Sequence, residues 1–379
     1  MRTSKVTLSL VFGLIVVAAA PMQGQSTFKL LHGFLGGNDG ANPTSGVVFG
    51  PNGYLYGVTL DGGAYGWGTV FSISPGGRYK MLHAFTGGAD GREPNNQLTW
   101  VGTSLYGGTN FGGAYKQGTL FKIDSASGDV TTVYTFNGID GGVPNCTMIP
   151  DKLGNLYGTT FLGGAYGVGN VFFFEPSSGS LTTLYSFKGG SDGQYPFGRM
   201  ARDANGNLYG ATVEGGGANN FGTIFRLTAS GQESVLYSFQ GWPVHDVYNP
   251  YTNLFKDSAG NLYGSAGGGA GDGAVFKVSK TGQETIYNVP SGTEGPSAVV
   301  EDSDGNFYGT LGIVGYYGGV FKMDSTGAYT ILYSFTGGLD GTSPGGAPVI
   351  RDAKGNLYGT SYQGGVSRKY GTVFELTFP

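Results

Sequence analysis

The stretch "DKLGNLYGTTFLGGAYGVGNVF" at residues 151–172 decides the fold, because its sequence pattern recurs along the chain. A "[LF]YG" triplet occurs seven times, and each copy is followed 13 to 16 residues later by the phenylalanine of a "G-[TNAG]-[VLI]-F" phrase. Successive triplets are 45 to 54 residues apart, which indicates an array of seven similar units. The tyrosines of the triplets are Tyr56, Tyr106, Tyr157, Tyr209, Tyr263, Tyr308 and Tyr358.

Each unit predicts four short strands. An apolar stretch ends in a "D-x-x-G-N" turn, as in "MARDANGN" (200–207), and is followed by the types "LYGTT" (156–160), "GTVF" and "LYSF" (184–187). The side chain of Asp caps such a turn, and Gly and Asn tolerate the positive φ angles that the turn requires. Four antiparallel strands per unit, repeated several times, are typical of propeller blades. We expect an all-β, seven-bladed β-propeller, with a linear β-solenoid as the alternative.

The two ends of the array predict how the ring closes. "FKLLHGF" (28–34) has the pattern of a fourth strand without a third, and "GTVFELTF" (371–378) that of a third strand without a fourth. We expect residues 28–34 to complete the last blade by pairing with about 371–377, which removes an open sheet edge. Residues 26–379 then form one domain, with repeats that start near residues 28, 81, 133, 184, 235, 286 and 331.

Residues 1–25 differ from the repeats. Arg2 and Lys5 precede an apolar run from Val6 to Ala20, and small or polar residues follow up to Gln25, which is the order of a secretory signal peptide. An uncleaved anchor is the alternative, although the run is shorter than the ~20 residues of a membrane span. The single cysteine, Cys146, permits no disulfide within the chain. We expect a secreted or periplasmic protein with no membrane span after cleavage, and a monomer.

Composition excludes several classes of function. The chain holds 75 glycines and a net charge of −4 with scattered basic residues, so no nucleic-acid footprint is present. No grouping of nucleophile, base or metal ligands stands out, so no cofactor or metal is expected and catalysis is left uncertain. The expected partner is a polysaccharide or another cell-surface polymer.

Strand order assigns the connections to two faces. The short turns after the first and third strands share one face, here called the short-turn face, and the long loops after the second and fourth strands share the other, the long-loop face. Loops on a rigid scaffold commonly carry function. One loop type repeats an acid, which favours either a ring of calcium ligands or, more simply, a side chain that holds its own turn. These acids are Asp39, Asp90, Asp140, Asp192, Asp246 and Asp340.

Candidate ligand-binding residues follow from departures from the repeat. Gln97, Thr147, Arg199 and Asn253 share one repeat position near the start of the innermost strand, where they are expected to line the channel mouth. Trp67 represents the aromatic residues of the long loops, which suit stacking on sugar rings. Trp242 and His245 belong to "GWPVHDVYNP" (241–250), a loop that departs from the usual "GG.DG" pattern.

The phrases "GNLYGTT..GGA.G.GTVF" and "LYSF.GG.DG..P" resemble the GloVer tandem repeat of exported bacterial proteins, over residues 28–379. The resemblance implies export and a repeated β architecture but no settled activity, and the chain departs from the family in having no evident C-terminal anchor. Three functions remain open. They are a non-catalytic protein that binds glycan or another surface polymer through the long-loop face, a polysaccharide hydrolase or lyase with its site at the channel mouth, and a structural protein of the cell envelope.

Overall fold

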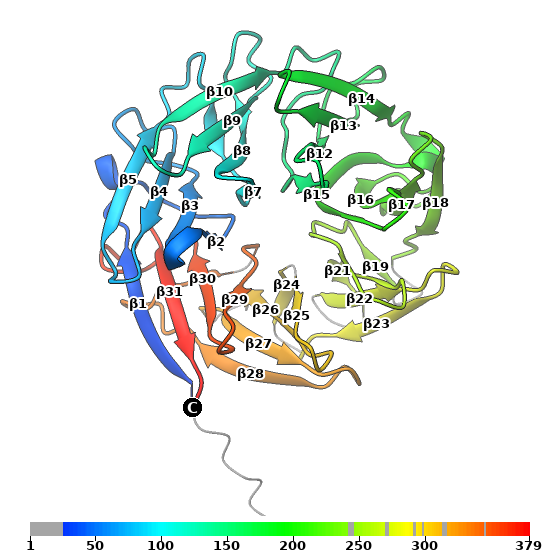
Figure 1. Cartoon of the computed structure of the whole chain (residues 1–379). Coiled ribbons are helices and arrows are strands. Elements are labelled where there is room, and N and C mark those ends of the chain that lie inside the picture. Colours follow the sequence, from blue (N-terminus) through cyan, green and yellow to red (C-terminus); the bar gives the residue numbers. More distant parts are fainter. Residues whose placement is uncertain are drawn as a thin grey trace, which may run out of the picture.

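The computed structural model describes residues 26–241, 246–269, 273–290, 293–297, 299–312, 317–344 and 346–379. Over these residues the chain forms 31 β-strands, three short 3-10 segments and no α-helix. The strands gather into seven antiparallel sheets. Figure 1 shows the sheets as blades around a central axis. The predicted all-β, seven-bladed β-propeller is therefore confirmed.

The first four blades follow one another along the chain. Blade 1 consists of β2 (Val47–Phe49), β3 (Leu55–Thr59), β4 (Thr69–Ile73) and β5 (Tyr79–Ala84). Blade 2 consists of β6 (Arg92–Pro94), β7 (Thr99–Val101), β8 (Ser104–Phe111), β9 (Thr119–Asp124) and β10 (Val130–Thr135). Blade 3 consists of β11 (Ile149–Pro150), β12 (Leu156–Thr160), β13 (Asn170–Glu175) and β14 (Ser180–Ser186). Blade 4 consists of β15 (Gln194–Arg202), β16 (Leu208–Glu214), β17 (Thr223–Leu227) and β18 (Glu233–Ser238).

The last three blades complete the ring. Blade 5 consists of β19 (Val247–Tyr248), β20 (Phe255–Lys256), β21 (Leu262–Gly268), β22 (Ala274–Val278) and β23 (Glu284–Asn288). Blade 6 consists of β24 (Glu294–Pro296), β25 (Val300–Glu301), β26 (Phe307–Gly312), β27 (Gly319–Met323) and β28 (Tyr329–Ser334). Blade 7 consists of β29 (Ile350–Arg351), β30 (Leu357–Ser361), β31 (Thr372–Thr377) and β1 (Thr27–Gly33). The 3-10 segments are η1 (Gly37–Asp39), η2 (Pro51–Gly53) and η3 (Gly190–Asp192).

Ring closure occurs as the sequence predicts. β1 pairs antiparallel with β31, from Thr27 opposite Thr377 to Gly33 opposite Thr372. In Figure 1 the blue first strand lies directly beside the red last strand. Both edges of β31 are thereby hydrogen-bonded, because β30 pairs with its other side.

The glycine of each "[LF]YG" triplet is explained by the phenylalanine across the ladder. A β carbon added at Gly57 would lie 2.5 Å from Cζ of Phe71, its register partner, so only glycine leaves room for the ring. Tyr56, one residue earlier, points the other way and packs with Leu105 and Phe121 of blade 2, as expected for a core residue. The same glycine–phenylalanine pairing occurs in every blade: Gly57–Phe71, Gly107–Phe121, Gly158–Phe172, Gly210–Phe225, Gly264–Phe276, Gly309–Phe321 and Gly359–Phe374.

Aromatic rings also join neighbouring blades. The phenylalanine that ends the "LYSF" phrase of one blade inserts against the third-strand phenylalanine of the next, as Phe85 does against Phe121 at 5.2 Å between ring centroids. Such tilted or edge-on pairs add about 0.5–1.5 kcal/mol each beyond burial. Equivalent pairs are Phe34–Phe71, Phe136–Phe172, Phe187–Phe225, Phe239–Phe276 and Phe335–Phe374.

A second joint fixes the long-loop face. The residue before the proline of the "GG.DG..P" phrase adopts a positive φ, 57° at Glu93, and its N–H donates to the carbonyl of Trp67 in the preceding blade at 2.9 Å. The proline itself packs on a glycine of that blade, since a β carbon at Gly68 would lie 2.6 Å from Cδ of Pro94. At ring closure Asn42 donates to Tyr370 in the same way, also at 2.9 Å. The long loops therefore start from a rigid rim.

Candidate functional site

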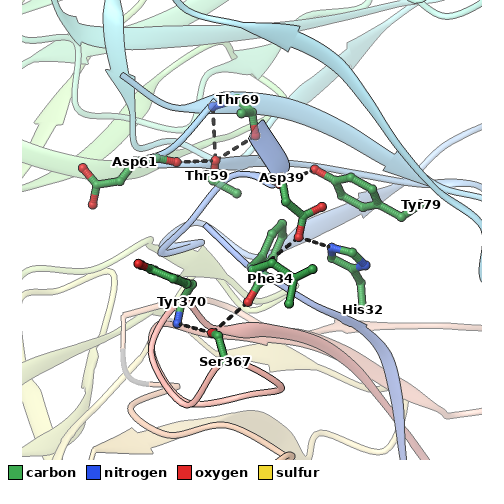
Figure 2. Close-up of polar contacts among 10 residues, drawn as sticks. His32, Phe34, Asp39, Thr59, Asp61, Thr69, Tyr79, Ser367 and Tyr370 are labelled. Atoms are coloured by element: carbon green, nitrogen blue, oxygen red, sulfur yellow. Dashed lines mark hydrogen bonds and ion pairs between the residues drawn. The ribbon is translucent and has the colours of Figure 1, made fainter. Parts of the chain in front are cut away.

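The repeated aspartates of the long-loop face hold their own turns. The carboxylate of Asp90 accepts the backbone N–H of Thr86 at 2.9 Å and lies 3.0 Å from Nε2 of His83. Figure 2 shows the equivalent Asp39 bonded to His32. In other blades a tyrosine hydroxyl replaces the histidine, donating to Asp140, Asp192, Asp246 and Asp340. These contacts support the turn-holding interpretation.

Metal binding has no support in the described part of the chain, where no three His, Cys, Asp or Glu side chains gather into a group that could hold an ion. Each repeated aspartate contributes one carboxylate to its own loop, and its oxygens already accept turn N–H groups and a ring donor. The calcium hypothesis therefore rests on no cluster among these residues.

The residues at the predicted rim position contact the neighbouring blades. The amide Nε2 of Gln97 donates to the carbonyl of Val47 at 3.0 Å, which ties blade 2 to blade 1. Thr147 is buried. Oδ1 of Asn253 accepts the backbone N–H of Arg199 at 2.7 Å, which ties blade 5 to blade 4. Gln97 and Asn253 thus link neighbouring inner strands through their side chains, a role that repeat alignment does not reveal.

Arg199 differs from the other rim residues. It lies in an irregular stretch of β15, where Phe197 and Ala201 are four positions apart while their partners on β16 are only two positions apart. Its carbonyl accepts the N–H of Leu254 at 2.8 Å, so both backbone groups of Arg199 bond to blade 5. The side chain is exposed and makes no hydrogen bond or ion pair with the described residues, yet the protein atoms around the guanidinium lower its pKa. Within the described part of the chain, no carboxylate pairs with the Arg199 cation on the inner strand of blade 4.

Sequence reasoning missed Tyr251, which lies on the inner segment of blade 5. The ring of Tyr251, 57% exposed, lies edge-on to Phe197 at 5.1 Å. Glu214, at the end of β16, accepts amide N–H groups from Gln194 at 2.9 Å and Asn220 at 3.2 Å. Burial and the charge of Glu214 raise the pKa of Tyr251. Tyr251 lies two residues before Asn253 in the same inner segment. This closeness in the sequence is the signal by which Tyr251 could have been predicted.

Part of the Trp67 indole packs against other residues of the protein. Its indole packs on Gly87, where an added β carbon would lie 2.8 Å from Cδ1, and the guanidinium of Arg92 sits 4.7 Å above its ring. The indole is nevertheless 37% exposed. Trp242 and His245 lie outside the described residues, so their part in a site stays a prediction.

Three tyrosines of the long loops are alike in position and exposure. Tyr65, Tyr115 and Tyr166 are 60%, 61% and 57% exposed, on blades 1, 2 and 3. Each follows a Gly-Ala pair in a turn closed by a backbone hydrogen bond of 3.1 to 3.2 Å. Gly63, Gly113 and Gly164 anchor these turns by donating to a glycine carbonyl of the adjoining loop at 2.7 to 2.9 Å. The rings therefore stand on rigid loops along three consecutive blades.

Two carboxyl groups, from Asp246 and Glu284, meet at the hydroxyl of Tyr237 on β18. The hydroxyl of Tyr237 lies 2.9 Å from Oδ2 of Asp246 and 2.7 Å from Oε2 of Glu284. Burial, together with the hydrogen bond to Asp246, raises the pKa of Glu284 to about 8. Burial and the charge of Asp192 likewise raise the pKa of Glu233, its counterpart one blade earlier, to about 7. Both glutamates stand where other blades carry apolar or aromatic residues.

These observations define the class of protein as a seven-bladed β-propeller built from tandem repeats. The chain belongs to the Gloeobacter/Verrucomicrobia repeat family, whose model matches residues 18–123 and 102–276. No curated protein matches the chain. The resemblance to the GloVer repeat is therefore confirmed.

Solved structures share the architecture. A virginiamycin B lyase from Staphylococcus aureus is 12% identical with a TM-score of 0.63, covering 94% of this chain and 100% of that one. An oligogalacturonate lyase in complex with manganese is 12% identical with a TM-score of 0.60, over 94% and 97%. The extracellular domain of a one-component system protein from B. thetaiotaomicron is 13% identical with a TM-score of 0.57, over 93% and 40%. At these identities the likeness concerns the fold alone. Over the described residues no helix is long and apolar enough to cross a membrane.

Proposed function

We propose that the protein is exported and binds a glycan or another surface polymer through its long-loop face, without catalysis. The observation that carries the proposal is the arc of Tyr65, Tyr115 and Tyr166, which present exposed rings at equivalent positions of three consecutive blades. Aromatic rings with a polar tip suit sugar surfaces, which have apolar faces and hydroxyl edges. Repetition at blade spacing suits a polymer, because successive rings can engage successive parts of one chain.

Export rests on the order of residues 1–25, which is that of a secretory signal. The extracellular domain among the structural neighbours is in keeping with it.

Retention on insoluble plant and bacterial polysaccharides tests the binding. Replacing Tyr65, Tyr115 and Tyr166 together by alanine is expected to weaken retention at least tenfold, at about 0.5–1.5 kcal/mol per aromatic contact. Tyr54→Ala is the matched control, because Tyr54 is also exposed but lies in a short turn before β3. Retention that survives the triple substitution, or that falls equally with Tyr54→Ala, would contradict the proposal.

A second function, a polysaccharide hydrolase or lyase, draws on Arg199, whose side chain forms no ion pair with the described residues and whose backbone N–H donates to Oδ1 of Asn253. Asp61 and Glu214, the acids at equivalent long-loop positions, belong to different blades, 1 and 4, which does not favour a carboxylate pair. Release of reducing or unsaturated ends from a retained polysaccharide, lost in Arg199→Gln, would favour this second function. Neither retention nor release would favour a structural role in the envelope.

A further inference from the structure

The seam between blades 6 and 7 holds a cavity of about 810 Å³. One side is a cross-strand row of blade 6, in which Lys322 pairs with Tyr308 and with Thr330. Arg351 and Lys354, at the first turn of blade 7, line it as well. Small-molecule sites commonly enclose about 300–1,000 Å³. The cavity therefore has the size of a ligand site, and its lining places it toward the short-turn face and away from the tyrosine arc.

The cavity follows from the way the ring closes. In blade 2 the turn between the third and fourth strands rests on the preceding blade, since a β carbon at Gly128 would lie 3.0 Å from Cδ2 of Leu82. In blade 7 these two strands are β31 and β1, which no turn joins within the described residues. Figure 1 shows their outer ends meeting beside β28. The wedge next to β28 is bounded instead by Ser26, Phe378 and Pro379.

The side chains that line the cavity include three cations and no carboxylate. Lys322, Arg351 and Lys354 form no ion pair with any described residue. Arg351 and Lys322 lie 5.4 and 6.0 Å from the ring centroid of Tyr308. The hydroxyl of Tyr308 donates to the turn carboxylate of Asp302 at 2.9 Å. Three cations in one cavity of an acidic protein favour an anionic ligand.

The neighbouring carboxylates do not neutralise these cations directly. Asp302 and Asp352 begin the "D-x-x-G-N" turns of blades 6 and 7, and their oxygens accept backbone and amide N–H groups of Asn306 and Asn356. These carboxylates are thus hydrogen-bonded within the turns and form no ion pair with Lys322, Arg351 or Lys354.

The rest of the lining indicates what kind of anion fits. Thr330 and Ser334 offer hydroxyls, and Ile331 offers exposed apolar surface. The carbonyl of Leu332 on β28 already accepts the hydroxyl of Ser26 at 2.5 Å, so an extended peptide cannot pair continuously along this strand. A sugar acid meets all these groups, with carboxylates for the cations, ring hydroxyls for Thr330 and Ser334, and an apolar ring face for Ile331. We propose that the cavity binds an acidic oligosaccharide made of uronic acid residues.

Calorimetric titration with trigalacturonate tests this site on the full-length protein. Binding is expected for the acid and not for its fully methyl-esterified form, which has the same body without charge. Lys354→Gln should weaken binding about fivefold, because it removes one exposed cation that makes no contact on which folding depends. Lys152→Gln, at an exposed lysine in the corresponding turn of blade 3, is the matched control and should change nothing.

Three results would overturn the proposal: equal binding of the acid and its ester, an unchanged affinity in Lys354→Gln, or no heat of binding at several millimolar. Triglutamate that competes as well as trigalacturonate would show that the cavity takes acidic peptides, against the sugar assignment. The site is independent of the proposed function. Replacement of Tyr65, Tyr115 and Tyr166 is expected to leave trigalacturonate binding intact, so failure at one face is distinguishable from failure at the other.

Discussion

Replacing Glu284 by glutamine is expected to make the protein more stable than the natural chain at alkaline pH. A phenol has one proton, so the hydroxyl of Tyr237 can donate to only one of the two carboxyl groups that it contacts. Asp246 also accepts the backbone N–H groups of Gln240 and Val247. Burial raises the pKa of Glu284 to about 8, so the carboxyl group of Glu284 keeps its own proton near neutral pH. Glutamine keeps an N–H donor at this place without an ionisable group.

The size of the effect follows from the pKa of Glu284, which rises from an ordinary 4.5 to about 8. At about 1.4 kcal/mol per pKa unit this corresponds to about 5 kcal/mol, of which we expect roughly 2 kcal/mol because solvent screens a partly buried group. The folded chain keeps the proton that the unfolded chain releases above pH 4.5. The contribution of Glu284 to stability is therefore complete below pH 4.5, falls as the pH rises, and is lost above about pH 8.

Thermal unfolding of both proteins, followed by calorimetry from about pH 5 to 9, measures this difference. The melting temperature of the natural chain should fall by a few degrees relative to Glu284→Gln over that range, at about 2 °C per kcal/mol for a large domain. Asp129→Asn, which removes an exposed carboxylate, should run parallel to the natural chain. Parallel pH profiles for the natural chain and Glu284→Gln would refute the raised pKa of Glu284.

Two further outcomes are expected. Gly158→Ala should destabilise the fold by about 1–3 kcal/mol in urea unfolding, because its β carbon would overlap the ring of Phe172. The control Gly76→Ala should cost far less, because no atom lies nearer than 3.8 Å to the added β carbon. Equal losses of stability in the two variants would contradict the packing argument. Cys146 should resist a thiol-specific reagent at about pH 8 until the chain is unfolded, since burial raises the pKa of its thiol to about 11; rapid labelling of the folded protein would count against this.

The sequence was sufficient for the ring because the fold depends on residues that recur. The triplet glycines, the third-strand phenylalanines and the prolines of the long loops each make the same contact in successive blades, so their periodicity carries the architecture. The pairing of β1 with β31 followed from the strand types at residues 28–34 and 371–378.

The candidate site was less accessible to such reasoning. Gln97 and Asn253 looked free because alignment of the repeats shows which positions are equivalent but not which carbonyl or N–H each amide reaches in the neighbouring blade. The Asp246–Glu284 pair was missed for the same reason, since its members belong to different repeats. The visible signal was glutamate in blades 4 and 5 at a position that is apolar or aromatic in the other blades. Arg199 forms no ion pair with the described residues, and its part in a ligand site stays a prediction.

The pairing of β1 with β31 also constrains the order of folding. Lys29 and Glu375, which form an ion pair across these strands at 3.0 Å, are 346 positions apart in the chain. Blades 1 to 6 are assembled from local hairpins and can form as the chain emerges, whereas blade 7 must await its last strand. Contacts of such long range slow folding, because the entropy of closing the loop is lost before the contact stabilises anything. We expect closure of blade 7 to be the slowest step of folding. We also expect the pairing of β1 with β31 to be the first to open under mechanical force.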